Sequence, residues 1–393
     1  MEISPTRALL VLAALCFGAM LTASTAAFAA PPADDEAAKV TPDMVQTGSD
    51  IPAHWKQPKS KADFDYVKRE VMIPMRDGVK LHTLILTPKH ARDLPLILER
   101  TPYDASADCA ANNSPHLADA VWSGWTDWAD GSFILVCQDL RGKFASQGKY
   151  ILNRPPRGPL NPTKTDDTTD AWDTIAWLVK HLEQSNGKVG MIGASYDGWA
   201  VVMALLHPHP ALRVAVAASP MIDGWMGDDW YHYGALRQEY VLHYSTWMMT
   251  QKGFGESVPR ENHDNYTEFL QAGSASAYAA AHGLKQLPWW NRFAVHPAYD
   301  AFWQLQAMDK LVAKHPSDVP TMWLQGLWDN EDIYGAVHAW EELKKAGHGT
   351  NNHLVIGPWW HSQIYRDSWQ TGPLRWPGNT TARFRQKVLI PWF

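Results

Sequence analysis

A glycine-flanked serine motif places the strongest constraint on the fold of this chain. Residues 193–198 read GASYDG, at the end of an apolar run (188–193) and just before a helical pattern (199–206). A serine at such a strand-to-helix turn is held in a strained conformation above the carboxyl edge of a sheet, and the turn needs small neighbours. The usual motif is G-x-S-x-G, whereas here Asp197 takes the second glycine position. Ser195 is therefore a candidate nucleophile, and a helix-capping serine is the structural alternative.

Strand-like and helix-like patterns alternate around this motif. Short apolar runs at 95–98 and 133–137 indicate strands buried on both faces, and 79–86 alternates as a half-buried strand does. Residues 166–182 carry apolar side chains at helical spacing, with acids at the start. Further strands are expected at 70–75, 188–193, 212–218, 319–324 and 353–356. This order predicts an α/β fold with a mainly parallel sheet and helices on both of its faces.

Composition distinguishes a middle segment and an N-terminal segment from the rest of the chain. Residues 61–222 and 301–393 carry the alternating pattern, whereas 223–300 is aromatic, polar and helical, with no strand-like run. We interpret 223–300 as a helical cap inserted between two strands, over the carboxyl edge of the sheet. Residues 30–60 are rich in Pro, Ala and charge, which predicts an arm or a disordered lead-in.

The first 29 residues are typical of a secretory signal peptide. Arg7 supplies the positive charge, 8–21 is nearly all apolar, and 27–29 (AFA) offers small residues for cleavage. We expect a secreted or periplasmic protein, and a retained N-terminal anchor is the alternative. No other stretch approaches the length of a transmembrane helix, so we expect no membrane contact after cleavage.

Cysteine content and charge exclude other classes of function. Cys109 and Cys137 remain after cleavage, but Cys137 lies in an apolar run, so we expect a small buried hydrophobe there rather than half of a disulfide. No cysteine pair has metal-binding spacing, and we expect neither a metal nor a cofactor. The net charge is −6 and no basic run occurs, which argues against a nucleic-acid partner.

Two later residues complete a nucleophilic triad with Ser195. Asp329 follows the strand-like run at 319–324, and His361 follows the run at 353–356. The order nucleophile, acid, base, each at the carboxyl end of a strand, is the order expected for this motif. His361 would be the general base, and Asp329 would orient its imidazole. An ordinary loop aspartate and a structural histidine are the alternatives.

A serine nucleophile also needs donors for the oxyanion of its tetrahedral intermediate. The backbone N–H of Tyr196, next after Ser195, is one candidate. The phenol of Tyr103, which follows the buried strand at 95–98, is the second candidate. The alternative is a tyrosine that only packs under the cap.

Together these motifs resemble one family. The chain is similar to the cocaine esterase and Xaa-Pro dipeptidyl peptidase superfamily, and within it to the α-amino acid ester hydrolases, also described as glutaryl-7-aminocephalosporanic acid acylases. The resemblance covers about residue 60 to the last residue. It rests on 100–104 (RTPYD), 138–142 (QDLRG), 193–198 (GASYDG), 326–329 (GLWD), 357–361 (GPWWH), 154–165 (RPPRGPLNPTKT) and 224–230 (GWMGDDW).

The resemblance implies an α/β-hydrolase fold and a small-molecule substrate. Such enzymes hydrolyse or transfer the acyl group of α-amino acid esters and of β-lactams. They hold the substrate ammonium in a cluster of acids, whose matching positions here are Asp229, Glu331 and Asp332 (the carboxylate cluster). Crowded carboxylates raise one another's pKa, and a bound cation relieves this repulsion. The alternatives are acids opening a helix at 333–343 for Glu331 and Asp332, and a helix cap for Asp229.

The family also suggests two features beyond the site. Its members continue into a C-terminal jelly-roll domain, and this sequence stops at the helix that leads there, so we expect that domain to be absent. They form homo-oligomers, which makes self-association a candidate property. The competing functions are an Xaa-Pro dipeptidyl peptidase, a general carboxylesterase, and a truncated, catalytically weak fragment that acts at most as a binding module.

Overall fold

The computed structural model describes residues 41–45, 49–56, 58, 61–227, 229–259 and 264–393. Its contacts divide the chain into two units, Met1–Lys59 and Ser60–Phe393. Among its described residues, the first unit contains one short 3₁₀ helix, η2 (Pro42–Met44). The predicted signal peptide at 1–29 and part of the predicted arm at 30–60 lie outside the described residues. Among the described residues, no helix has the length and apolar character needed to cross a bilayer.

The second unit is built on one eight-stranded sheet in the order β1-β2-β4-β3-β5-β6-β9-β10. Five of its seven strand pairings are parallel, and the two antiparallel pairings join β1, β2 and β4 at one edge. The predicted α/β fold with a mostly parallel sheet is therefore confirmed. The strands are β1 (Tyr66–Pro74), β2 (Lys80–Pro88), β3 (Leu94–Thr101), β4 (Ile134–Asp139), β5 (Ser185–Ser195), β6 (Leu212–Pro220), β9 (Thr321–Gly326) and β10 (Asn352–Gly357).

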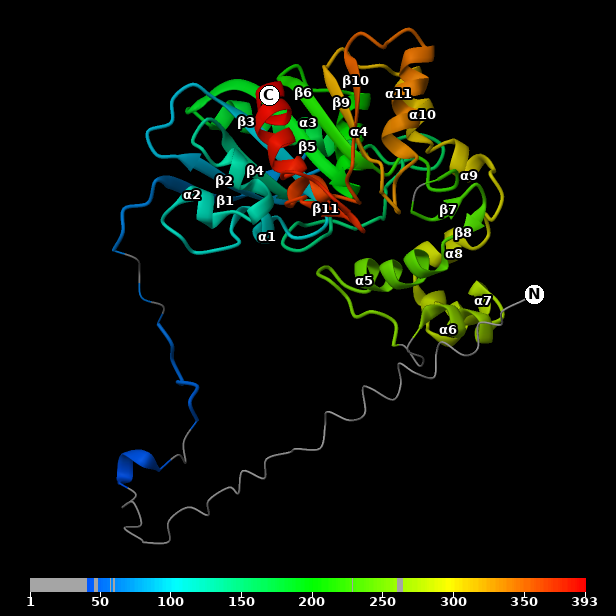
Figure 1. The fold of residues 1–393 in the computed structure, drawn as a ribbon, viewed down its shortest axis with the longest axis horizontal. Coiled ribbons are helices and arrows are strands. Elements are labelled where there is room, and N and C mark those ends of the chain that lie inside the picture. Colours follow the sequence, from blue (N-terminus) through cyan, green and yellow to red (C-terminus); the bar gives the residue numbers. More distant parts are fainter. Residues whose placement is uncertain (1–40, 46–48, 57, 59–60, 228, 260–263) are drawn as a thin grey trace, which may run out of the picture. The chain divides into compact units, whose positions relative to one another are not determined.

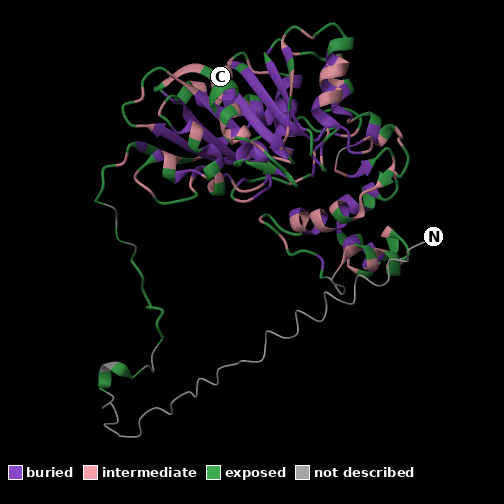
Figure 2. Ribbon diagram, in the orientation of Figure 1, coloured by how far each residue is buried: buried purple, intermediate pink, exposed green. Residues whose placement is uncertain are grey.

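Helices cover both faces of this sheet, because its central strands are apolar on both sides. Along β3, Leu96 and Leu98 belong to one buried cluster and the intervening Ile97 belongs to another. Figure 2 shows the sheet strands as the most continuously buried part of the fold. The helices of the sheet domain are α1 (Ala105–Cys109), α2 (Leu117–Ala120), η3 (Ser123–Trp128), α3 (Asp167–His181), α4 (Tyr196–Leu206), α9 (Ala301–Gln304), α10 (Met308–Lys314), α11 (Gly335–Lys345), η6 (Gln363–Tyr365), α12 (Thr380–Phe384), η7 (Arg385–Leu389) and α13 (Ile390–Trp392).

The helix predicted at 166–182 is α3, and its N-terminal residues explain why it begins where it does. Asp166 is the N-cap of α3, and its side chain accepts a hydrogen bond from Thr169 N. In return, the Thr169 hydroxyl accepts a hydrogen bond from Asp166 N. This reciprocal arrangement is a capping box, which satisfies N–H groups that the first helical turn leaves free. Asp167 and Asp170 add favourable negative charge to the same turn.

Short helices dominate the segment between β6 and β9, as predicted, and Figure 1 shows α5 to α8 grouped beside the sheet domain. One detail of the prediction is wrong. The segment at 223–300 also contains a small antiparallel hairpin, because two-residue strands are too short to leave an alternating pattern. Its elements are β7 (Tyr231–His232), β8 (Ala235–Leu236), η4 (Tyr240–Tyr244), α5 (Ser245–Met249), α6 (Asn265–Ala272), α7 (Ala275–Ala281), η5 (Leu284–Gln286) and α8 (Pro288–Phe293). A second two-stranded sheet, β11 (Gln370–Thr371) with β12 (Leu374–Arg375), follows β10.

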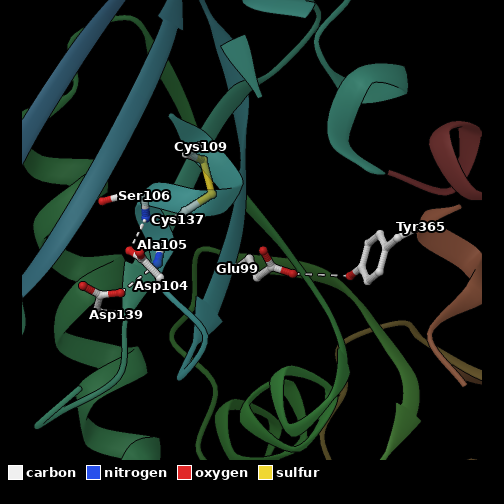
Figure 3. Close-up of a disulfide and its surroundings, with 8 residues drawn as sticks. All are labelled: Glu99, Asp104, Ala105, Ser106, Cys109, Cys137, Asp139 and Tyr365. Atoms are coloured by element: carbon white, nitrogen blue, oxygen red, sulfur yellow. Dashed lines mark hydrogen bonds between the residues drawn. A yellow bond between two sulfur atoms is a disulfide. The ribbon is translucent and has the colours of Figure 1, made fainter. Parts of the chain in front are cut away.

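A disulfide joins α1 to the sheet, which corrects the expectation for Cys137. Cys109 closes α1 and bonds to Cys137 of β4, with both side chains fully buried (Figure 3). Asp104 caps the start of the same helix, and Asp139 of β4 accepts a hydrogen bond from Ala105 N at 2.8 Å. The apolar run correctly predicted a buried Cys137, but burial does not distinguish a thiol from a disulfide when the partner comes from a distant helix.

Candidate active site

Ser195 stands at the turn between β5 and α4. It is the last residue of the strand and the N-cap of the helix, with φ 61° and ψ −123°. A positive φ is strained for serine and is found at sites that the surrounding structure holds in place. A Cβ atom at Gly193 would lie 2.3 Å from the Asp197 carbonyl oxygen, and one at Gly198 would lie 2.8 Å from the Ala218 carbonyl oxygen. Gly198 lies one position later than the second glycine of the usual motif, but it still permits the close approach of α4 to β6.

The unusual Asp197 points into the protein interior, where it is buried. Burial, followed by the nearby Asp108 carboxylate, raises the pKa of Asp197 well above its ordinary value. Burial likewise raises the pKa of Glu99 well above its ordinary value, and that of Asp108 to about 7. Burial thus disfavours the charged form of Asp197 and makes this residue part of the core beneath Ser195.

Asp329 and His361 meet as the chain order predicts. Nδ1 of His361 lies 3.0 Å from each carboxylate oxygen of Asp329. The Asp329 oxygens also accept hydrogen bonds from the backbone N–H groups of Glu331 and Asp332, at 2.8 and 3.0 Å, and from Gln325 Nε2 at 3.2 Å. The aspartate is therefore fixed by the turn that follows β9, and it can hold one tautomer of the imidazole.

The two partners stabilise each other's charged forms. Burial alone would raise the pKa of Asp329, but the hydrogen bond and charge of His361 hold it below its ordinary value. Burial alone would lower the pKa of His361, but Asp329 and then Glu331 and Asp229 raise it above its ordinary value. The imidazole is thus a stronger base than a free histidine.

The ring edge of His361 that carries Nε2 is turned toward the carboxylate cluster. Its Nε2 lies 3.3 Å from Glu331 Oε2 and 3.9 Å from Asp332 Oδ2. Ser195 Oγ donates to the same Asp332 oxygen at 3.5 Å. The hydroxyl and the imidazole therefore converge on one carboxylate oxygen.

Asp229 joins this cluster from the segment that precedes β7. Its backbone N–H donates to Asp332 Oδ1 at 3.3 Å. Burial and the charge of Glu331 raise the pKa of Asp229 to about 6. Neither helical alternative holds, because β7 follows Asp229 and α11 begins only at Gly335, so Glu331 and Asp332 lie in the preceding turn. The helix predicted at 333–343 thus begins two residues later than expected.

Both candidate oxyanion donors lie close to this centre. Tyr196 is the first residue of α4, and the first N–H groups of a helix have no acceptor within the helix. The Tyr103 ring lies edge-on to the Tyr196 ring, with 6.5 Å between centroids, and its hydroxyl is 2.8 Å from the hydroxyl of Tyr244. Burial raises the pKa of Tyr103 well above its ordinary value, so its phenol stays a neutral donor.

The arrangement supplies a hydroxyl, a base with its orienting acid, neutral donors and three convergent carboxylates. This set suits acyl transfer from a substrate that carries a positive charge near its carbonyl. Within the described ranges, no group of three or more His, Cys, Asp or Glu side chains is placed to hold a metal ion.

Comparison with known proteins adds the family. A family model described as X-Pro dipeptidyl-peptidase (S15 family) matches residues 77–363, a stretch that contains every candidate site residue. The chain belongs to the S15 family. The resemblance seen in the sequence motifs is thereby confirmed.

The similar proteins include ester and peptide hydrolases. A solved α-amino acid ester hydrolase is 54% identical, with a TM-score of 0.83 over 88% of this chain and 57% of its own. A solved aminopeptidase from a marine sediment archaeon, Thaumarchaeota archaeon, is 44% identical, with a TM-score of 0.82 over 90% of this chain and 57% of its own. The cocaine esterase of Rhodococcus sp. (strain MB1 Bresler) is 27% identical over 76% of this chain and 49% of its own. The chain thus spans about half the length of these similar proteins.

Three further residues at this site were not predicted, and all come from the segment at 223–300. Arg237 donates to the backbone carbonyl oxygens of Asn330 and Glu331 and so fixes the turn that carries the cluster. Tyr240 has its pKa raised by burial and then by a hydrogen bond to Glu331. Tyr244 contacts Tyr103, as described. A single sequence offers no signal for them, because cap side chains reach the site only through tertiary packing.

Proposed function

We propose that this chain is a serine hydrolase that cleaves or transfers the acyl group of α-amino acid esters. The observation that carries the proposal is that Glu331 Oε2 and Asp332 Oδ2 lie near Nε2 of His361. This nitrogen would accept the proton of Ser195. A carboxylate cluster next to a nucleophile favours a substrate whose ammonium lies one carbon from the scissile carbonyl. The 54% identity to an α-amino acid ester hydrolase supports the same substrate class.

The proposed mechanism proceeds through an acyl-enzyme. Ser195 Oγ attacks the ester carbonyl carbon and its proton passes to His361 Nε2. The N–H of Tyr196 and the phenol of Tyr103 stabilise the oxyanion. The carbon–oxygen bond to the alcohol then breaks, and the alcohol leaves with the proton from His361. Water attacks the acyl-enzyme by the same sequence and releases the amino acid, while another amine or alcohol in place of water gives transfer.

A second candidate substrate is an amide with a free amino terminus. The aminopeptidase that is 44% identical supports it, since such a substrate also presents an ammonium to the cluster. Comparing a phenylglycine ester with a phenylglycyl amide and an X-Pro dipeptide amide separates the two. An esterase should turn over the ester alone at a substantial rate.

The test of the main proposal uses a pair of esters that differ only in the α-amino group. Phenylglycine methyl ester should exceed phenylacetic methyl ester in kcat/KM by about thirtyfold to several thousandfold, because truncating one partner of a buried charge pair costs about 2–5 kcal/mol. Equal kcat/KM values at a pH where the amine is charged would mean a general esterase.

We further propose that residues 1–29 direct export of the chain. The Cys109–Cys137 disulfide supports this, because such bonds persist in oxidising compartments. Mass spectrometry of the protein recovered from culture medium and periplasm should give a chain that starts near residue 30. Recovery of the uncleaved chain from the membrane fraction would favour the retained anchor.

A further inference from the structure

A cavity of about 350 Å³ lies beside the active site, between the sheet domain and the cap. Its walls come from 151–156 and 160–163, from α4, from the four residues after β6, from α8 and α9, and from Trp230, Gln306 and Met308. Five aromatic side chains dominate the lining: Trp199, Trp230, Trp289, Phe302 and Trp303. None of the eight candidate site residues is among the described residues that line it. Its size and its apolar walls are those of a small-molecule site.

Asn153 is one of the residues that line this cavity. The side-chain nitrogen and oxygen of Asn153 are both inaccessible to solvent and have no hydrogen-bond partner among the described residues. Buried polar atoms without a partner are costly and therefore uncommon in folded proteins. Asn153 also has a φ of 41°, and its backbone N–H donates to the Tyr196 hydroxyl at 2.7 Å. The backbone of Asn153 is thus one hydrogen bond from the side chain of Tyr196, the residue that follows Ser195.

The charged groups at the cavity favour an anion. Arg154 is buried and donates to the Lys149 carbonyl oxygen at 2.6 Å, while Arg292 is exposed on α8. In the part of the chain that the structure describes, neither guanidinium forms an ion pair with a carboxylate. The one acid in the lining, Asp223, already accepts hydrogen bonds from the Tyr299 hydroxyl at 2.7 Å and from Trp225 N at 3.0 Å.

We propose that this cavity is a binding site for a small aromatic carboxylate. The ring packs among the tryptophans, and the carboxylate accepts hydrogen bonds from the side chains of Arg154 and Arg292. Planar guanidinium groups match a carboxylate in geometry as well as in charge. The catalytic centre has the opposite preference, because its three acids repel an anion.

The test measures phenylacetate binding to the full chain carrying Ser195→Ala, by isothermal titration calorimetry. Inactive protein separates binding from turnover, so the result does not depend on the proposed function. Arg292→Gln should raise the Kd about tenfold or more, since it removes a charged hydrogen-bond donor at an exposed position. Asn153→Asp keeps the size and the tolerance for a positive φ but adds a negative charge to the cavity wall, so it should also raise the Kd.

Three controls test where phenylacetate binds and whether its binding needs the negative charge. Arg213→Gln removes an exposed arginine of β6 away from the cavity lining and should leave the Kd unchanged. Saturating phenylglycine methyl ester should not displace phenylacetate, and the neutral phenylacetamide should bind more weakly. The proposal is wrong if phenylacetate does not bind, if both cavity variants bind it as Ser195→Ala alone does, or if the amino ester competes with it.

Discussion

His361 Nε2 lies 3.3 Å from Glu331 Oε2, so the candidate base touches a candidate amine-binding acid directly. The same nitrogen must accept a proton from Ser195 if the serine is to attack. A substrate ammonium that binds Glu331 would compete with His361 for that carboxylate and leave the imidazole for the serine. Substrate recognition and activation of the base are therefore coupled through one side chain in the proposed mechanism.

Ser195→Ala should give a folded protein without esterase turnover. The substitution removes the oxygen that forms the acyl-enzyme, and losses of this kind reach on the order of 10⁶ in kcat. Circular dichroism checks the fold, and mass spectrometry after an organophosphate reagent should locate the label on Ser195 of the unsubstituted protein. Labelling of another serine, together with an active Ser195→Ala variant, would contradict the assignment.

Tyr103→Phe should lower kcat about a hundredfold or more with little change in KM. An oxyanion donor acts only in the transition state, and losing one costs about 2.7–4 kcal/mol. Tyr244→Phe is the matched control, because it removes the hydroxyl next to Tyr103 and leaves that of Tyr103 in place. If kcat does not change in Tyr103→Phe, the tyrosine only packs under the cap.

Glu331→Gln should reduce the preference for the amino ester by harming that ester alone. Phenylacetic methyl ester should be hydrolysed no worse, since it brings no ammonium to the cluster. The Glu331 charge also raises the pKa of His361, so neutralising it should move the acid limb of the pH–rate profile to lower pH. An equal loss on both esters, with no shift of that limb, would mean that Glu331 serves the fold instead.

The preference for the amino ester should depend on pH in a bell shape. The pKa of Asp229 is raised to about 6, so the cluster loses negative charge as the pH falls through about 6, and ammonium binding weakens. At the alkaline end the substrate amine, with a pKa of about 7.7–8.0, loses its own charge. The ratio of kcat/KM for the two esters cancels the titration of His361, which both reactions share. A ratio that stays constant from acid to alkaline pH would exclude the ammonium cage.

Replacing both Cys109 and Cys137 by alanine should lower the free energy of unfolding by about 2–4 kcal/mol. The bond closes a loop of the chain, so its loss gives the unfolded state more conformational freedom. Urea denaturation with and without a reducing agent measures the effect. The reducing agent should destabilise the unsubstituted protein and leave the double variant unaffected. Equal stability of both proteins would show that the bond contributes nothing.

The sheet was predictable because local patterns encode it. Apolar runs mark strands that are buried on both faces, and parallel strands bring their carboxyl ends to one edge, where Asp329 meets His361 and Ser195 meets Asp332. The contacts of the site were not predictable in the same way. They depend on rotamers and on how the cap packs. Examples are the hydrogen bond from Ser195 Oγ to Asp332 and the contact by which Arg237 fixes the turn at Glu331. The disulfide escaped prediction for a related reason, because pairing depends on distance in space.

The disulfide bears on how this protein should be prepared. Tyr103 is followed at once by α1, and that helix is tied to β4 at Cys109. A host that keeps thiols reduced would deliver a mixture of bonded and unbonded molecules, with the loop of Tyr103 anchored in one population and released in the other. Two batches of identical sequence would then differ in specific activity. Thiol titration therefore belongs beside every rate measured on this chain.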